Sequence, residues 1–82
     1  MREMEFKMER PGLIKEGDEV EILERSSSVN YHYIIEPAIA MSGCFLERER
    51  LKTLKGIVKE IKQRETGYYV IVLFDEDDVI RI

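Results

Sequence analysis

One seven-residue run constrains the fold of this chain more than any other feature of its sequence. Residues 68–74 read Tyr-Tyr-Val-Ile-Val-Leu-Phe, so β-forming side chains occupy both of the faces that a strand would present. A strand that is apolar on both faces is typically covered on both sides. Because 82 residues provide enough apolar surface for one core only, the run predicts the central strand of a single small domain.

The segment before this run allows two interpretations. Four apolar residues fall at helical spacing: Leu51, Leu54, Val58 and Ile61. They would make the domain α+β, with a helix around residues 47–62. Against the helix, Gly56 lies in its middle and costs about 1 kcal/mol relative to alanine, and a glycine-containing turn follows. We therefore favour a hairpin in which residues 54–62 pair with residues 68–74, with a bulge near the last two of those apolar residues.

Further strands are predicted by alternating apolar residues or by β-branched and aromatic residues. Four segments have one of these patterns: 4–9, 19–25, 31–35 and 79–82. Turn-forming residues separate the segments, and we expect the acidic run at 75–78 to be one such turn in solvent. Residues 38–45 are rich in small side chains and fit a helical turn or a packed loop equally well.

The predicted fold is all-β and mainly antiparallel, and one set of inward residues forms its core: Val20, Ile22, Ile34, Val58, Val70, Val72 and Phe74. The Gly-Ile-Val and Phe-Asp-Glu pieces within residues 54–61 and 67–76, with the Gly-Asp turn and strand of residues 15–22, resemble SH3-like small barrels such as the KOW, Tudor and CAP-Gly modules. Residues 26–50 exceed the usual loop of such barrels, so the resemblance implies an elaborated segment there. It also implies a module that binds peptides or nucleic acid.

A single domain over residues 13–82 accounts for these elements, and residues 1–12 form either an N-terminal strand or a flexible tail. Uncharged stretches such as 26–35 are far shorter than the ~20 apolar residues that span a bilayer, and the N-terminus lacks the apolar core of a secretory signal. Cys44 is the only cysteine, whereas small secreted domains usually contain several disulfides. We therefore expect a cytoplasmic protein.

No motif of the sequence predicts catalysis, a metal site or a cofactor. The only histidine is His32, near serines 26–28, and no Gly-x-Ser-x-Gly elbow is present, so a small hydrolase is a distant alternative. His32 and Cys44 supply two soft ligands where a structural zinc site has four, and we expect Cys44 to be a small buried apolar residue. We therefore predict no catalytic residue, no metal ligand and no cofactor.

Basic residues gather between positions 48 and 64, although the net charge of the chain is −4. With two nearby tyrosines they define a basic strip: Arg48, Arg50, Lys52, Lys55, Lys59, Lys62, Arg64, Tyr68 and Tyr69. Such a strip could contact a phosphate backbone and stack a base, but lysines also protect a hairpin edge against aggregation. We therefore predict a non-enzymatic binding module whose favoured partner is another protein, with RNA or DNA on the basic strip as the alternative.

Self-association is a further expectation. Apolar side chains alternate at both ends of the chain: Met4, Phe6 and Met8 near the first, Ile80 and Ile82 at the last. An unpaired apolar edge strand is a template for pairing. The two edges could pair within one chain and close a barrel, or pair across a two-fold axis in a homodimer. We favour the dimer, because Pro11 and Gly12 form a suitable hinge.

Overall fold

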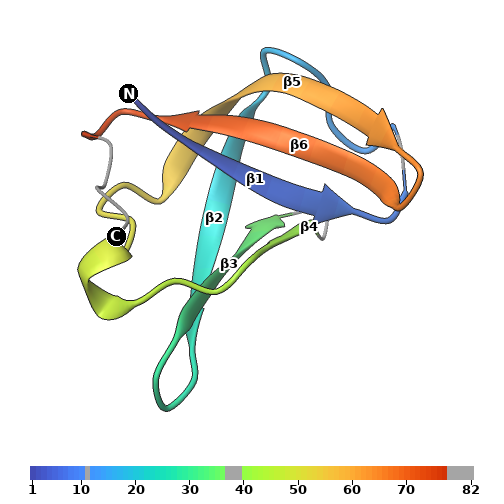
Figure 1. The fold of residues 1–82 in the computed structure, drawn as a ribbon. Helices are drawn as coiled ribbons and strands as arrows, with labels where there is room; N and C mark the ends of the chain where they lie inside the picture. Colours follow the sequence, from blue (N-terminus) through green and yellow to red (C-terminus); the bar gives the residue numbers. More distant parts are fainter. Residues whose placement is uncertain (11, 37–39, 78–82) are drawn as a thin grey trace.

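The computed structural model describes residues 1–10, 12–36 and 40–77 and shows an all-β architecture, as predicted. Its elements in chain order are β1 (Arg2–Met8), β2 (Glu19–Ser26), β3 (Tyr31–Glu36), β4 (Ala40–Ser42), the 3-10 turn η1 (Glu47–Glu49), β5 (Lys55–Arg64) and β6 (Gly67–Phe74). The strands form a closed antiparallel barrel with the neighbour order β1-β4-β3-β2-β5-β6, and β6 pairs with β1 (Figure 1).

The predicted hairpin of β5 and β6 is present, and the alternative helix around residues 47–62 is not. Within that region η1 is the only helical element, and it has three residues. β5 pairs with β6 over most of its length, and the register shifts between Val58 and Glu60, where we expected a bulge. Position 56 of β5 requires glycine, because β6 packs so closely against it that a side chain would collide with that strand.

β6 is covered on both faces, as its sequence predicts. It lies between β5 and β1 in the barrel, and Val70 and Phe74 are fully buried in the interior. Ile71 points the other way and is nevertheless buried. It lies between Glu5 of β1 and Glu60 of β5, and charged side chains that pair across β6 cover the outer surface of the strand.

β1 closes the barrel and is not the edge strand that we predicted. It pairs with β6 along its whole length and with β4 at its second half. Its apolar side chains Met4, Phe6 and Met8 are buried in the core, so they offer no edge to a second chain. β1 therefore closes the barrel within one chain, and it does so by pairing with β6 and β4. The other predicted edge, at Ile80 and Ile82, lies outside the described residues.

The core contains six of the seven predicted residues: Val20, Ile22, Val58, Val70, Val72 and Phe74. Ile34 was predicted wrongly, because it lies on the outer face of β3 while its neighbours Tyr33 and Ile35 are fully buried. Tyr33 can point inward because its hydroxyl reaches the end of the barrel, where it donates to Glu24 and accepts from the backbone N–H of Leu51.

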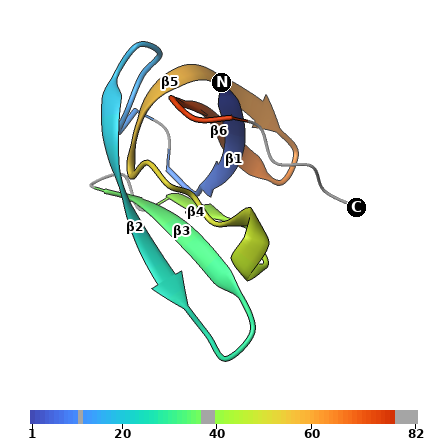
Figure 2. The same ribbon diagram turned by 90° about the vertical axis from the view of Figure 1, so that its left-hand side faces the viewer.

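The β2–β3 hairpin extends beyond the rest of the barrel (Figures 1 and 2). Its turn is closed by a backbone hydrogen bond of 2.8 Å from Ser27 to Asn30, in the polar segment where we predicted a loop. In the segment that the sequence left open, β4 is a strand of three residues and Phe45 bridges to Tyr31. Among the described residues no helix is both long enough and apolar enough to cross a membrane.

Candidate functional site

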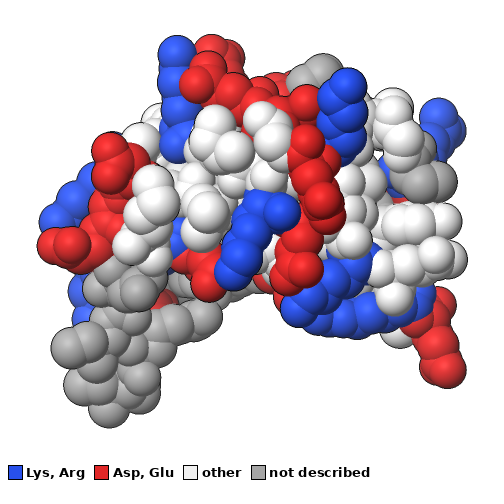
Figure 3. Space-filling view, turned by 90° about the horizontal axis from the view of Figure 1, so that it is seen from above, with Lys and Arg blue, Asp and Glu red and all other residues white. Residues whose placement is uncertain are grey.

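The basic strip that the sequence predicts is largely paired with carboxylates. Five of its seven cations are in ion pairs: Arg50–Glu24 (2.7 Å), Lys55–Glu21 (3.8 Å), Lys59–Glu3 (2.9 Å), Lys62–Glu60 (3.5 Å) and Arg64–Glu5 (3.0 Å). Figure 3 shows the result, since blue and red side chains lie next to one another across the face that it views. The strip is therefore a surface of mixed charge in the folded protein.

The other members of the strip are not brought together on one surface. Tyr68 packs against the core, whereas Tyr69 lies on the outer face with the Arg64 guanidinium 4.4 Å from its ring centroid. Arg48 and Lys52 line a cavity of about 470 Å³ whose wall also carries the acidic residues 75–77. The structure therefore separates the two tyrosines from each other and places acidic groups beside the two remaining cations.

A polar cluster closes the end of the barrel around Tyr33. Its hydroxyl lies 2.8 Å from a Glu24 carboxylate oxygen, and that carboxylate also accepts hydrogen bonds from Arg50. The Arg50 guanidinium lies over the ring of Tyr31, 4.4 Å from its centroid. Hydrogen bonds from Arg50 hold the pKa of Glu24 below its usual range. The cluster fastens residues 50–51 to β2 and β3, which is a structural role.

Alkaline pH tests this cluster. Burial of the ring, with the hydrogen bond to Glu24, raises the pKa of Tyr33 to about 12, above the value of about 10 in an unfolded chain. The folded state therefore retains a proton that the unfolded state releases, so this contribution to stability is present below about pH 10 and is lost as the pH rises toward about 12.

We expect Tyr33→Phe to lower the free energy of unfolding at pH 7 by about 1–2 kcal/mol, because the Leu51 N–H loses its acceptor. The variant should then lose less stability than wild type between pH 10 and 12. Urea unfolding at each pH measures both effects, and an equal loss in the two proteins over that window would contradict the assignment.

A second buried network joins the start of β1 and the segment after β6 to residues 49–53. Arg2 donates to the carbonyl oxygens of Glu49 (2.6 Å) and Arg50 (3.2 Å) and lies 3.4 Å from a Glu76 carboxylate oxygen. The other carboxylate oxygen of Glu76 accepts the backbone N–H groups of Lys52 and Thr53. We predicted that the acidic run at 75–78 lies in solvent. That prediction is wrong for Glu76, because its carboxylate is needed to satisfy this network.

The residues with potential chemistry lie apart from one another. His32 is on the outer face of β3, opposite Arg25 of β2, and Cys44 is exposed, which corrects our expectation that it is buried. No cluster of three or more His, Cys, Asp and Glu residues suited to a metal ion occurs in the described residues. The geometry of these residues assembles neither a catalytic group nor a metal site.

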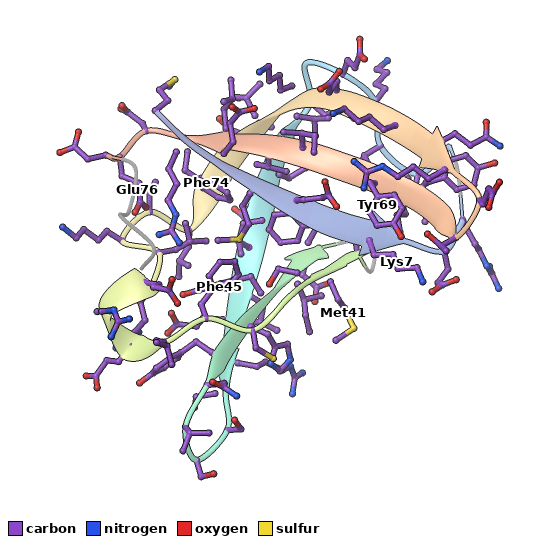
Figure 4. All side chains as sticks on the ribbon, in the orientation of Figure 1. Lys7, Met41, Phe45, Tyr69, Phe74 and Glu76 are labelled. Carbon is purple, nitrogen blue, oxygen red and sulfur yellow. The ribbon has the colours of Figure 1, made fainter. Side chains whose placement is uncertain are left out.

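The outer face of β2, β3 and β4 carries the most distinctive surface. Cross-strand pairs form an apolar row, which we define as Leu23, Ile34 and Met41. Leu23 is 40% exposed and Met41 is 48% exposed, and Met41 points away from the barrel in Figure 4. Beyond Met41 the next residue across the strands is Lys7 of β1, so the apolar row ends beside a charged side chain.

Charged rows flank the apolar row on both sides. One step along the strands, Glu21 pairs across with Glu36, and we call these two residues the acidic row. One step the other way, Arg25 pairs across with His32, and these two form the basic row. The face thus has three parallel rows that run across the strands, in the order acidic, apolar and basic.

Our sequence analysis missed this face, although the sequence contains a signal for it. Ile22-Leu23 and Ile34-Ile35 are apolar doublets, and a strand places the two members of a doublet on opposite faces. One member of each doublet must therefore point out of the barrel. The sequence alone does not say which, and it does not reveal that the outer members pair with each other.

The comparisons with known proteins add no relative to this description. No protein-family model, no curated protein and no solved structure matches the chain. The fold defines the class of protein, a small closed antiparallel β-barrel.

Proposed function

We propose that this chain is a non-enzymatic binding module of the SH3-like small-barrel type, and that its partner is another protein. The observation that carries the proposal is the apolar row, in which the exposed Leu23 and Met41 and the half-buried Ile34 line up on hydrogen-bonded strands with charges on either side. An apolar centre with a polar rim is the usual anatomy of a protein interface. Strands of a closed barrel hold the three side chains in fixed positions, which reduces the entropy that binding costs.

Nucleic acid is the weaker alternative because of the ion pairs of the basic strip. A protein binds phosphates by replacing the counterions around them with its own cations. In this protein most of the strip's cations already have a carboxylate within 4 Å, and those carboxylates repel a phosphate backbone. The apolar row has no such competing interaction with phosphate and fits a protein surface better.

The test is capture of a protein from an extract of the native host by the immobilised chain. Leu23→Glu places a charge in the apolar row, at the centre of the proposed interface, and should reduce capture at least about tenfold, since central interface residues carry most of the binding energy. Leu13→Glu is the matched control, because Leu13 is 50% exposed and lies outside the row. Equal capture by wild type and Leu23→Glu would contradict the proposal.

The same preparations test the alternative. We expect no retention of single-stranded RNA or DNA at low salt. Retention that falls steeply with ionic strength, and that Lys55→Ala, Lys59→Ala and Lys62→Ala together abolish, would favour nucleic acid instead.

A further inference from the structure

We propose that the protein bound by the apolar row is a second copy of this chain, in a two-fold dimer formed face to face by the β2–β3–β4 surfaces. This inference rests on the proposed function and specifies its partner. It replaces the edge-to-edge dimer suggested by the sequence, because β1 pairs with β6 and β4 within one chain and its apolar side chains are buried in the core. The order of the three rows favours this arrangement.

The three rows are complementary to themselves. A two-fold axis that runs along the apolar row, between two such faces, places Leu23, Ile34 and Met41 opposite the same residues of the second copy. The same rotation reverses the strand direction. The acidic row of each copy therefore lies opposite the basic row of the other, and this occurs twice, as in any isologous interface.

The alternative two-fold arrangement is disfavoured by charge. An axis parallel to the strands leaves the strand direction unchanged, so it places the acidic row opposite the acidic row. Glu21 and Glu36 would then face two further carboxylates, and like charges across an interface are strongly unfavourable. In the favoured arrangement only Lys7, at the end of the row, faces a like charge, whereas in this one all four residues of the charged rows do, so the row order selects the first orientation.

The groups of the charged rows are available for these contacts. Glu21 has an ion pair with Lys55 at 3.8 Å, but both side chains are mostly exposed, and pairs of this kind contribute little. Arg25 is exposed, and the His32 ring can donate an N–H to a carboxylate. Each copy therefore brings two carboxylates and two donors to the contact.

The size of the surface also fits. A stable interface buries roughly 800 Å² of each partner, about a seventh of the 5630 Å² that this chain exposes. Three apolar side chains alone cannot supply that area, so the charged rows must be within the contact. Two sheets packed face to face keep their strands roughly aligned and lie about 10 Å apart, which brings both charged rows within reach of their counterparts.

Sedimentation equilibrium of the full chain tests the proposal. We expect wild type to move from monomer to dimer between about 5 and 500 µM. One variant carries Glu21→Lys and Glu36→Lys, and a second carries Arg25→Glu and His32→Glu. In each variant both charged rows carry the same sign of charge, so either variant by itself should dimerise at least about 100-fold more weakly than wild type. An equimolar mixture of the two variants should form a dimer again, because every charged row then faces its opposite.

The controls use the same charge reversals at residues outside the three rows: Glu16→Lys with Glu65→Lys, and Arg10→Glu with Lys15→Glu. These should dimerise as wild type does, and circular dichroism confirms that every variant is folded. A monomeric wild type at 500 µM, a dimer that neither variant weakens, or a mixture that fails to associate would each overturn the proposal. The capture experiment with Leu23→Glu is read independently, so a monomeric wild type that still captures a different protein through the apolar row rejects the dimer and retains the proposed function.

Discussion

Gly56→Ala is expected to lower the free energy of unfolding by about 2–3 kcal/mol, near the upper end of what overpacking a core costs. A Cβ atom at this position would lie 2.4 Å from a methyl carbon of Val72 and 2.8 Å from the carbonyl oxygen of Leu73. The Val72 side chain is fully buried, and the carbonyl oxygen belongs to the backbone of β6. Neither can rotate away, so the two strands must move apart.

That movement would disturb the barrel at a point where β5 contacts two neighbouring strands. Gly56 pairs with Val20 of β2 on one side and lies against β6 on the other, so it is the point where β5 passes from one neighbour to the next. A displacement of β5 there affects both pairings. We therefore expect a loss of stability with no compensating new contact.

Gly43→Ala is the matched control, because a Cβ atom on Gly43 would meet nothing within 4 Å. The backbone of Gly43 is not in the left-handed region, so alanine fits there without strain. We expect a change within about 0.5 kcal/mol. Urea unfolding followed by circular dichroism measures both variants, and an equal effect at the two positions would show that the close approach of β5 to β6 is not what requires glycine.

The sequence was sufficient to predict the strands whose pattern is unambiguous. Residues 68–74 are apolar on both faces, and no element other than a doubly covered strand accommodates them in a chain of this size. Gly56 was correctly taken as evidence against a helix. The reason was its cost in helix propensity, not its packing. Its packing against β6 depends on a strand that is distant along the chain, and no local pattern reveals that contact.

Sequence reasoning failed where two apolar residues are adjacent. In β3 it placed Ile34 in the core, and aliphatic residues are in general buried more often than tyrosine. The structure buries Tyr33 instead, since its hydroxyl finds two partners at the end of the barrel. A shift of one residue reverses the face of every side chain in a strand. The apolar row was hidden by this single difference, because Ile34 is its middle residue.

The carboxylates that form ion pairs with the basic strip could not be predicted from the sequence either. Two cations of the basic strip are separated from their carboxylates by more than 50 positions, Lys59 from Glu3 and Arg64 from Glu5. These pairs exist because β1 lies beside β6, which depends on closure of the barrel. The sequence therefore shows the cations of the strip, whereas the carboxylates that neutralise them are brought beside them by the topology of the barrel.

The largest effect is expected from Arg2→Ala, which should lower the free energy of unfolding by about 3–5 kcal/mol. The side chains of Arg2 and Glu76 are 6% and 7% exposed, so the variant leaves a carboxylate buried without its cation. It also removes the donor to the carbonyl oxygens of Glu49 and Arg50. In the wild type the described residues contain no buried side-chain nitrogen or oxygen without a partner, so the variant introduces a kind of defect that this part of the chain otherwise lacks.

Lys59→Ala is the control for this prediction, because it breaks an ion pair of 2.9 Å whose side chains are about half exposed. Such a pair contributes at most about 1 kcal/mol, so the two variants separate burial from ion pairing as the source of stability. Arg2→Lys should fall between them, since it keeps the charge but cannot reach three acceptors with one planar group.

Arg2 continues the inward alternation of Met4, Phe6 and Met8, and it is the member of that series whose charge must be satisfied inside the barrel. If chemical unfolding shows that Arg2→Ala costs no more than Lys59→Ala, the network does not fasten the two strand ends together, and closure of the barrel depends on the apolar side chains of β1 alone.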